Sequence, residues 1–79
     1  MVMVMVGVDC TFTESGTVQV RQVMMDGRWQ AVEQGRQWMD GNGRHILIML
    51  PNNQVRELLL RPDTLSWEMH PDAPKTAVV

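Results

Sequence analysis

The side chains in this sequence that could carry out chemistry are few and lie far apart. A nucleophilic site would need Cys10 or a serine beside a histidine and an orienting acid, and the chain has two histidines, His45 and His70. His45 lies within an apolar segment, where a histidine is more often a satisfied core residue than a base. A chain of 79 residues also leaves little room to enclose a typical substrate pocket. We therefore expect no enzymatic activity and no small-molecule substrate.

A bound metal or cofactor is not expected either. Cys10, His45 and His70 are the available ligands, but their spacings match no zinc pattern. Gly41-Asn42-Gly43 has the composition of a turn, and no helix start follows it that could bind a phosphate. The aspartates fall mostly in predicted turns or near the ends of the chain, where carboxylates bond local backbone amides. The sequence thus predicts no metal site, no cofactor and no catalytic pair of carboxylates.

Arginine and tryptophan are the combination that suggests a binding surface. The chain has six arginines, one lysine and three tryptophans. Arginines interleaved with aromatic rings are typical of surfaces that bind single-stranded nucleic acid. The competing interpretation is that the tryptophans anchor the core and the arginines cover them. If this surface binds nucleic acid, the residues that form it are Arg21, Arg28, Arg36, Trp38 and Arg44.

The two ends of the chain differ in composition from the middle. Residues 1–8 read MVMVMVGV, which is too short to span a bilayer and lacks the basic region and cleavage site of a secretion signal. We expect this segment to form an edge strand or a frayed end, and its three methionines leave the natural start open. Residues 71–79 contain two prolines and no periodicity, which predicts a disordered tail. The expectation is one β domain over residues 9–70, in the cytoplasm and not at a membrane.

The middle of the chain has the pattern of an all-β protein. Turn signals recur roughly every eight to twelve residues between positions 17 and 69, which is the spacing of short antiparallel strands. Cys10 stands alone, so no disulfide within the chain stabilises the fold. We predict a small antiparallel meander, or an SH3-like, partly open barrel of five or six short strands.

Asp26-Gly27 is the strongest turn signal, because both residues tolerate the positive φ that a type I′ turn requires. A two-residue loop there pairs Met25 with Arg28, Met24 with Trp29, and Gln22 with Ala31. The register predicts one inner face, made of Val18, Val20, Met24, Trp29 and Ala31. The alternation after the last turn also places Trp67 inside. Trp38 is then the one tryptophan that is expected to be available for stacking on a base. The register also turns Glu33 inward, a conflict that a bulge near Val32 or an end of the pairing there would remove.

Residues 45–50 and 55–60 each carry apolar side chains on both faces. We favour a hairpin of two strands over the alternative, a short helical turn near residues 54–61 after an Asn53 cap. A turn that pairs Leu50 with Val55 creates an apolar face beyond the one that fills the core, formed by Leu47, Met49, Leu58 and Leu60. A small soluble domain rarely leaves such a face exposed to solvent, so we expect residues 1–8 or a second chain to cover it. The sequence therefore favours a protein-interaction module with a protein partner or a homodimer, and nucleic-acid binding is the alternative.

Overall fold

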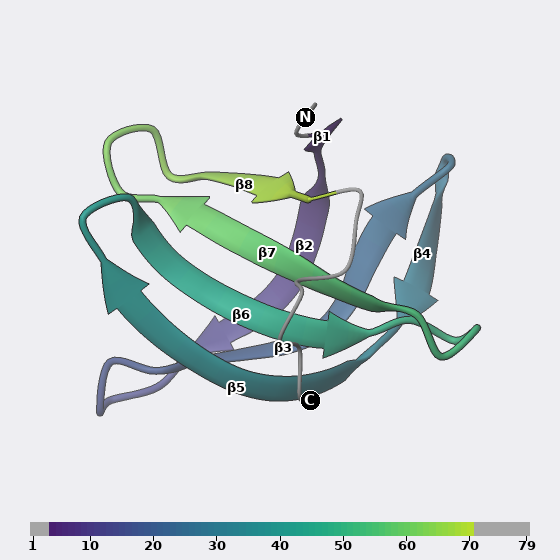
Figure 1. Cartoon of the computed structure of the whole chain (residues 1–79), viewed down its shortest axis with the longest axis horizontal. Helices are drawn as coiled ribbons and strands as arrows, with labels where there is room; N and C mark the ends of the chain where they lie inside the picture. Colours follow the sequence, from purple (N-terminus) through teal and green to yellow (C-terminus); the bar gives the residue numbers. More distant parts are fainter. Residues whose placement is uncertain (1–3, 71–79) are drawn as a thin grey trace.

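The structure of this protein is a computed structural model that describes residues 4–70 as two antiparallel β-sheets (Figure 1). One sheet has five strands in the order β1-β8-β7-β6-β5, and the other has three in the order β2-β3-β4. The strands are β1 Val4–Met5, β2 Gly7–Phe12, β3 Val18–Met25, β4 Arg28–Ala31, β5 Glu33–Asp40, β6 Gly43–Met49, β7 Val55–Arg61 and β8 Ser66–Met69. The predicted all-β class is confirmed, and the two sheets do not form a closed barrel.

Two segments of the chain bend and contribute to both sheets. Only Val6 separates β1 from β2, and only Val32 separates β4 from β5. At these bends the Val6 N–H donates to the carbonyl of Trp67 and the Val32 N–H donates to the carbonyl of Arg21, each at 3.1 Å. Pairing therefore continues across each bend, and six segments joined by turns give eight strands.

The ends of the chain are described in part. Val4–Met5 of the apolar N-terminal segment is an edge strand of the five-stranded sheet, paired with β8. Residues 1–3 and the segment 71–79, which the sequence predicts to be a disordered tail, lie outside the described residues. Within residues 4–70, no helix is long and apolar enough to cross a membrane.

The predicted Asp26-Gly27 hairpin is confirmed together with its register. Asp26 and Gly27 have φ values of 54° and 79°, and the pairs Gln22–Ala31, Met24–Trp29 and Met25–Arg28 all form. The predicted inner face is correct in its first half, where Val18 and Val20 are buried. It is wrong in its second half, because Trp29 is 48% exposed.

A β-bulge at Arg21 explains this error. Asp9 pairs with Gln22 and Cys10 pairs with Val20, so Arg21 is an extra residue in β3. One extra residue turns every following side chain to the other face of a sheet. Val23 is consequently fully buried, whereas Met24, Trp29 and Ala31 face outward.

The predicted conflict at Glu33 is removed as the sequence suggested, by an end of the pairing. The ladder between β3 and β4 ends at Ala31, and the chain bends at Val32. Val32 packs against the core, and Glu33 is exposed opposite Met49 of β6.

The apolar face predicted from β6 and β7 is wrong in its grouping because the register differs by one residue. The Leu50 N–H donates to the carbonyl of Gln54, so Met49 pairs with Val55. Leu58 then pairs with Ile46 inside the core, and Leu60 lies on the same side of β7 as Leu58. Leu47 and Met49 lie on the opposite side of the sheet. Residues 55–61 form strand β7, so the alternative of a helical turn near 54–61 is not formed.

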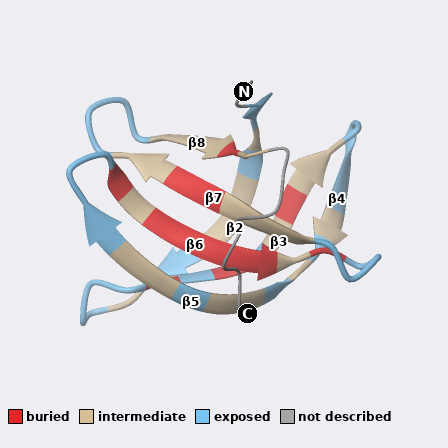
Figure 2. Ribbon diagram, viewed as in Figure 1, coloured by how far each residue is buried: buried red, intermediate tan, exposed pale blue. Residues whose placement is uncertain are grey.

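The core lies between the two sheets. The longest run of buried residues follows β6 and β7 (Figure 2), where Leu47 and Leu59 are also buried, on the opposite face of the sheet. Side chains from both sheets meet in the core in one buried cluster of Val18, Val20, Val23, Ile46, Ile48, Leu50, Leu58 and Met69. Trp67 packs against this cluster, as the sequence predicts, and so does Cys10. The apolar contact between the sheets is what stabilises this small domain.

Two glutamine side chains join the sheets where no backbone ladder does. Gln34 Oε1 accepts a hydrogen bond from Val20 N at 2.7 Å, and its Nε2 donates to the Val18 carbonyl at 2.8 Å. Gln37 Oε1 accepts from Val18 N at 3.0 Å, and its Nε2 donates to the same carbonyl at 2.8 Å. A bulge in β5 between these glutamines, where Gly35 and Arg36 together oppose one residue of β6, lets both point toward β3. The edge of β3 is therefore satisfied by side chains.

Candidate functional site

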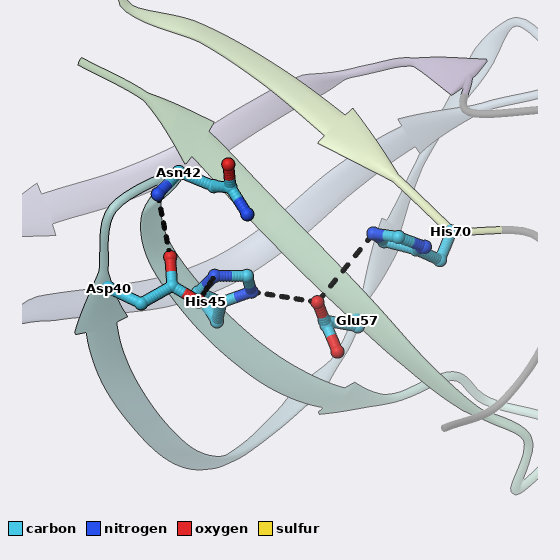
Figure 3. Close-up of polar contacts among 5 residues, drawn as sticks. All are labelled: Asp40, Asn42, His45, Glu57 and His70. Atoms are coloured by element: carbon cyan, nitrogen blue, oxygen red, sulfur yellow. Dashed lines mark hydrogen bonds and ion pairs between the residues drawn. The ribbon is translucent and has the colours of Figure 1, made fainter. Parts of the chain in front are cut away.

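A histidine held between two carboxylates is the densest group of polar side chains on the five-stranded sheet (Figure 3). His45 lies on β6, Glu57 lies diagonally across from it on β7, where it pairs with Leu47, and Asp40 ends β5. His45 Nδ1 lies 2.8 Å from Glu57 Oε2, and His45 Nε2 lies 2.9 Å from Asp40 Oδ2. The second contact is an ion pair whose N–H is not aligned well enough for a hydrogen bond. His70 Nε2 lies 3.6 Å from the same Glu57 oxygen.

This arrangement favours the charged form of His45. Burial alone would lower the pKa of His45, but the contacts with Glu57 and Asp40 outweigh it and raise the pKa above 6.5. The same contact with His45, helped by the backbone N–H of Asn42, lowers the pKa of Asp40 below 3.8. The contacts of its two ring nitrogens with Glu57 and Asp40 link β6 to β7 and to the end of β5.

The structure does not bring Cys10 to this cluster. Cys10 lies on β2 of the other sheet and packs against the core, where burial is the largest cause of a raised thiol pKa. His45 and His70, in contrast, meet around Glu57. Among residues 4–70, no group of three or more histidine, cysteine or acidic side chains is arranged to hold a metal ion. What the geometry of the His45 cluster supports is cross-linking of three strands.

Trp38 is not the free aromatic ring that the sequence predicts. Its ring stacks on the His45 ring at 5.1 Å between centroids with 1° between the planes. The guanidinium of Arg36 lies 5.4 Å from the centroid of the Trp38 ring. Trp38 thus contributes to the packing around His45 and offers little ring surface for stacking on a base.

The arginines proposed to bind nucleic acid lie on both sheets and have different partners. Arg21, at the bulge, forms an ion pair with Asp9. Arg44 donates to the Gln37 side chain and to the Gly16 carbonyl, which ties the two sheets together. Arg28 is exposed beside the Asp26-Gly27 turn. The described residues therefore do not assemble these arginines and Trp38 into one groove.

The exposed aromatic side chains are instead Phe12, which is 61% exposed at the end of β2, and Trp29, which lies on the outer face of the three-stranded sheet. Gly7 of β2, Met24 of β3 and Trp29 of β4 form one cross-strand row there. A Cβ at position 7 would lie 3.3 Å from Met24 Cβ and 3.7 Å from Trp29 Cη2, so the indole reaches across β3 to β2. Met5, in the preceding strand β1, is 63% exposed. The row Gly7, Met24 and Trp29 is called the Trp29 face below.

A groove lies beside the end of β4. It has a volume of about 330 Å³ and lies where the chain bends into β5, next to the turn between β6 and β7. Its lining residues are Ala31, Val32, Glu33, Met49, Leu50, Pro51 and Asn53. The groove is mainly apolar with one carboxylate, and it is close to the Trp29 face because β4 contributes to both.

The sequence contained only weak signals for these features. The Gly7–Met24–Trp29 row lies on the outer face because of the bulge at Arg21. No turn residue in the sequence indicates this bulge. Comparisons of the chain with protein-family models, with curated proteins and with solved structures found no match. The functional argument therefore depends on the geometry alone.

Proposed function

We propose that this protein is a non-enzymatic interaction module that binds another protein through the Trp29 face. The observation that supports this most directly is the position of Trp29. This large apolar side chain is 48% exposed on the outer face of a sheet and is not packed into the core. Tryptophan is among the residues that contribute most to protein–protein binding energy. Its ring is large and has few rotatable bonds, so little conformational entropy is lost on binding.

The surroundings of Trp29 fit such a contact. Gly7 leaves the sheet flat beneath the ring, and Met24 adds an adaptable apolar side chain. The ion pair of Arg21 with Asp9 lies further along the same two strands and gives the surface a polar border. An apolar centre with a polar rim is the usual arrangement of a protein interface.

The other candidate functions have less support in the geometry. In the described part of the chain no cysteine, serine or threonine bonds to His45, and its two imidazole nitrogens contact Glu57 and Asp40. The arginines named for nucleic acid lie on two sheets, and Trp38 is stacked on His45. The described surface therefore favours binding to another protein as the function.

The test is affinity capture followed by reconstitution of the complex. Partners are captured with the wild-type protein, and each is then purified and titrated against wild type, Trp29→Ala and Met39→Ala. Met39 is the matched control because it is apolar and 62% exposed on the other sheet. We expect Trp29→Ala to weaken the binary complex at least ~30-fold, as loss of a hot-spot residue does, and Met39→Ala to leave it unchanged. A partner that binds Trp29→Ala with wild-type affinity contradicts the proposal.

A further inference from the structure

We infer that the free edge of β4 pairs antiparallel with β4 of a second copy of this chain. This inference depends on the proposed function, since β4 carries Trp29, and it names a second copy as the partner. Four features of β4 support pairing at this edge: its unpaired backbone groups, the lack of a protecting residue on the strand, the charges at its two ends, and the groove beside it.

The backbone groups of Trp29 and Ala31 point away from the sheet. In a two-residue hairpin the residues that flank the turn, Met25 and Arg28, form a hydrogen-bonded pair. The bond from Val32 N to the Arg21 carbonyl fixes the same alternation at the other end of β4. Arg28, Gln30 and Val32 therefore face β3, and the N–H and C=O groups of Trp29 and Ala31 face outward. Among the described strands, β4 is paired only with β3.

Nothing on β4 protects this edge from pairing. Natural edge strands are commonly blocked by lysine, proline, a bulge or a covering loop. The sequence of β4 is RWQA, with regular pairing to β3 and no proline or lysine. The part of the β3 edge that β4 does not reach differs from this. Its backbone groups at Val18 and Val20 are hydrogen-bonded to the side chains of Gln34 and Gln37. Among residues 4–70, β4 is thus an edge that is open to another strand.

The charges at the two ends of β4 select an antiparallel second copy. Arg28 begins the strand and Glu33 follows its end, and both residues are exposed. When Trp29 lies opposite the partner's Ala31, Arg28 lies opposite the partner's Val32, one residue along the chain from the partner's Glu33. Two-fold symmetry produces this contact twice. Parallel pairing would instead place the two copies of Arg28 side by side, which is unfavourable.

The groove beside β4 fits the side chain that this register delivers to it. The partner's Arg28 lies next to Val32 and Glu33, which are both groove residues. The methylene stem of an arginine packs on apolar side chains while its guanidinium meets a carboxylate. Met49, Leu50 and Pro51 offer the apolar wall, and Glu33 offers the carboxylate. The same register brings the two Trp29 side chains onto one continuous outer face.

A charge-swap experiment tests this inference by sedimentation equilibrium. The full chain is compared with Arg28→Glu, Glu33→Arg and the variant that carries both changes, and thermal unfolding checks that each variant is folded. We expect wild type to dimerise, each single variant to dimerise at least tenfold more weakly, and the double variant to recover wild-type association. Recovery requires the two positions to meet across the interface, because each single variant keeps its own fold but faces a like charge.

Two outcomes overturn the inference. One is a wild-type protein that stays monomeric at every concentration. The other is a dimer whose dissociation constant is unchanged by Arg28→Glu and by Glu33→Arg. Either outcome leaves the proposed function intact if a captured partner still loses affinity on Trp29→Ala. The proposed function fails separately, when no reconstituted partner depends on Trp29.

Discussion

His45 shows how the surroundings of one residue decide what it does. The sequence indicates a satisfied histidine in an apolar segment, and the structure places it 7% exposed between Glu57 and Asp40 with Trp38 stacked on its ring. Neither acid could be assigned to it from the sequence, because they come from two other strands and depend on the registers of β5 and β7. The result is a histidine whose charged form is favoured and whose contacts link the edge strand β5 to β6 and β7.

This geometry predicts a pH dependence of stability with a definite sign. The folded state raises the pKa of His45, so its contacts stabilise the fold fully below pH 6.5 and are lost as the pH rises through the raised value. Asp40 acts in the opposite direction, because its pKa is lowered. Its contribution is present above pH 3.8 and is lost as the pH falls through the lowered value.

The measurement is an NMR titration of the His45 ring protons in wild type, Glu57→Gln and Asp63→Asn. We expect His45 to titrate above 6.5 in wild type and at a lower pH in Glu57→Gln, because the variant removes a carboxylate 2.8 Å away. Asp63, whose side chain is 68% exposed and lies in another turn, serves as the control and should leave the titration of His45 unchanged. A wild-type His45 that titrates at or below 6.5 contradicts the assignment.

The three tryptophans show what could be predicted at single positions. Trp67 packs against the core as the alternation in the last strand indicates. Trp29 and Trp38 exchange their expected roles, since Trp29 is exposed and Trp38 is stacked on His45. For Trp29 the cause is the bulge at Arg21, which reverses the inner and outer faces of the hairpin.

At the scale of elements, turn chemistry was predictable and strand pairing was not. Asp26-Gly27 specified its hairpin and register because the turn itself fixes them. The turn between β6 and β7 has no such dipeptide, and its register differed by one residue from the expected one. That single step placed Leu58 in the core and separated it from Leu47.

Gly43 gives an element-scale prediction about the hairpin of β5 and β6. Its φ is +140°, and a Cβ there would overlap the carbonyl oxygen of Leu60 on β7. We expect Gly43→Ala to lower the free energy of unfolding by about 2 kcal/mol or more, because backbone strain and overpacking add together. Gly41→Ala is the matched control, since nothing lies within 4 Å of a Cβ at that position.

Urea unfolding of both variants provides the measurement. The control is expected to stay close to wild type, so the comparison separates the backbone strain and the overlap with β7 at position 43 from the general effect of replacing a glycine in this turn. Equal stability of Gly43→Ala and Gly41→Ala would show that β7 does not approach β6 as closely as the structure indicates.

The glutamines that join the sheets give a second prediction at this scale. Gln34→Leu leaves Val20 N–H and one bond to the Val18 carbonyl without the partner that Gln34 supplies. Loss of a partner by a buried backbone group costs about 1–3 kcal/mol, so the free energy of unfolding should fall by that amount. Gln19→Leu makes the same chemical change at an exposed position of β3 and should cost less than ~0.5 kcal/mol. Equal losses in the two variants would contradict the bridging role of Gln34.

The whole molecule is two small sheets that share a core and leave one aromatic face outside. The sequence predicted the all-β class and an apolar surplus, which follow from turn spacing and composition. It placed that surplus on β6 and β7, whereas the large apolar side chains that the structure exposes lie on other segments: Val4, Met5, Phe12, Trp29, Met39 and Leu65. Bulges and bends determine which face of each strand points to solvent. They depend on pairing between strands that are distant in sequence, so the local pattern of apolar residues does not predict them.

The central claim is that the three-stranded sheet is the binding surface of this protein. Backbone and indole NMR chemical shifts, followed through a dilution series and through titration with a reconstituted partner, test it most directly. The account predicts that the shift changes concentrate on the Trp29 indole, the amides of Trp29 and Ala31, and Met24. Changes confined to the His45 cluster on the five-stranded sheet, or binding that leaves the Trp29 indole resonance unmoved, would contradict it.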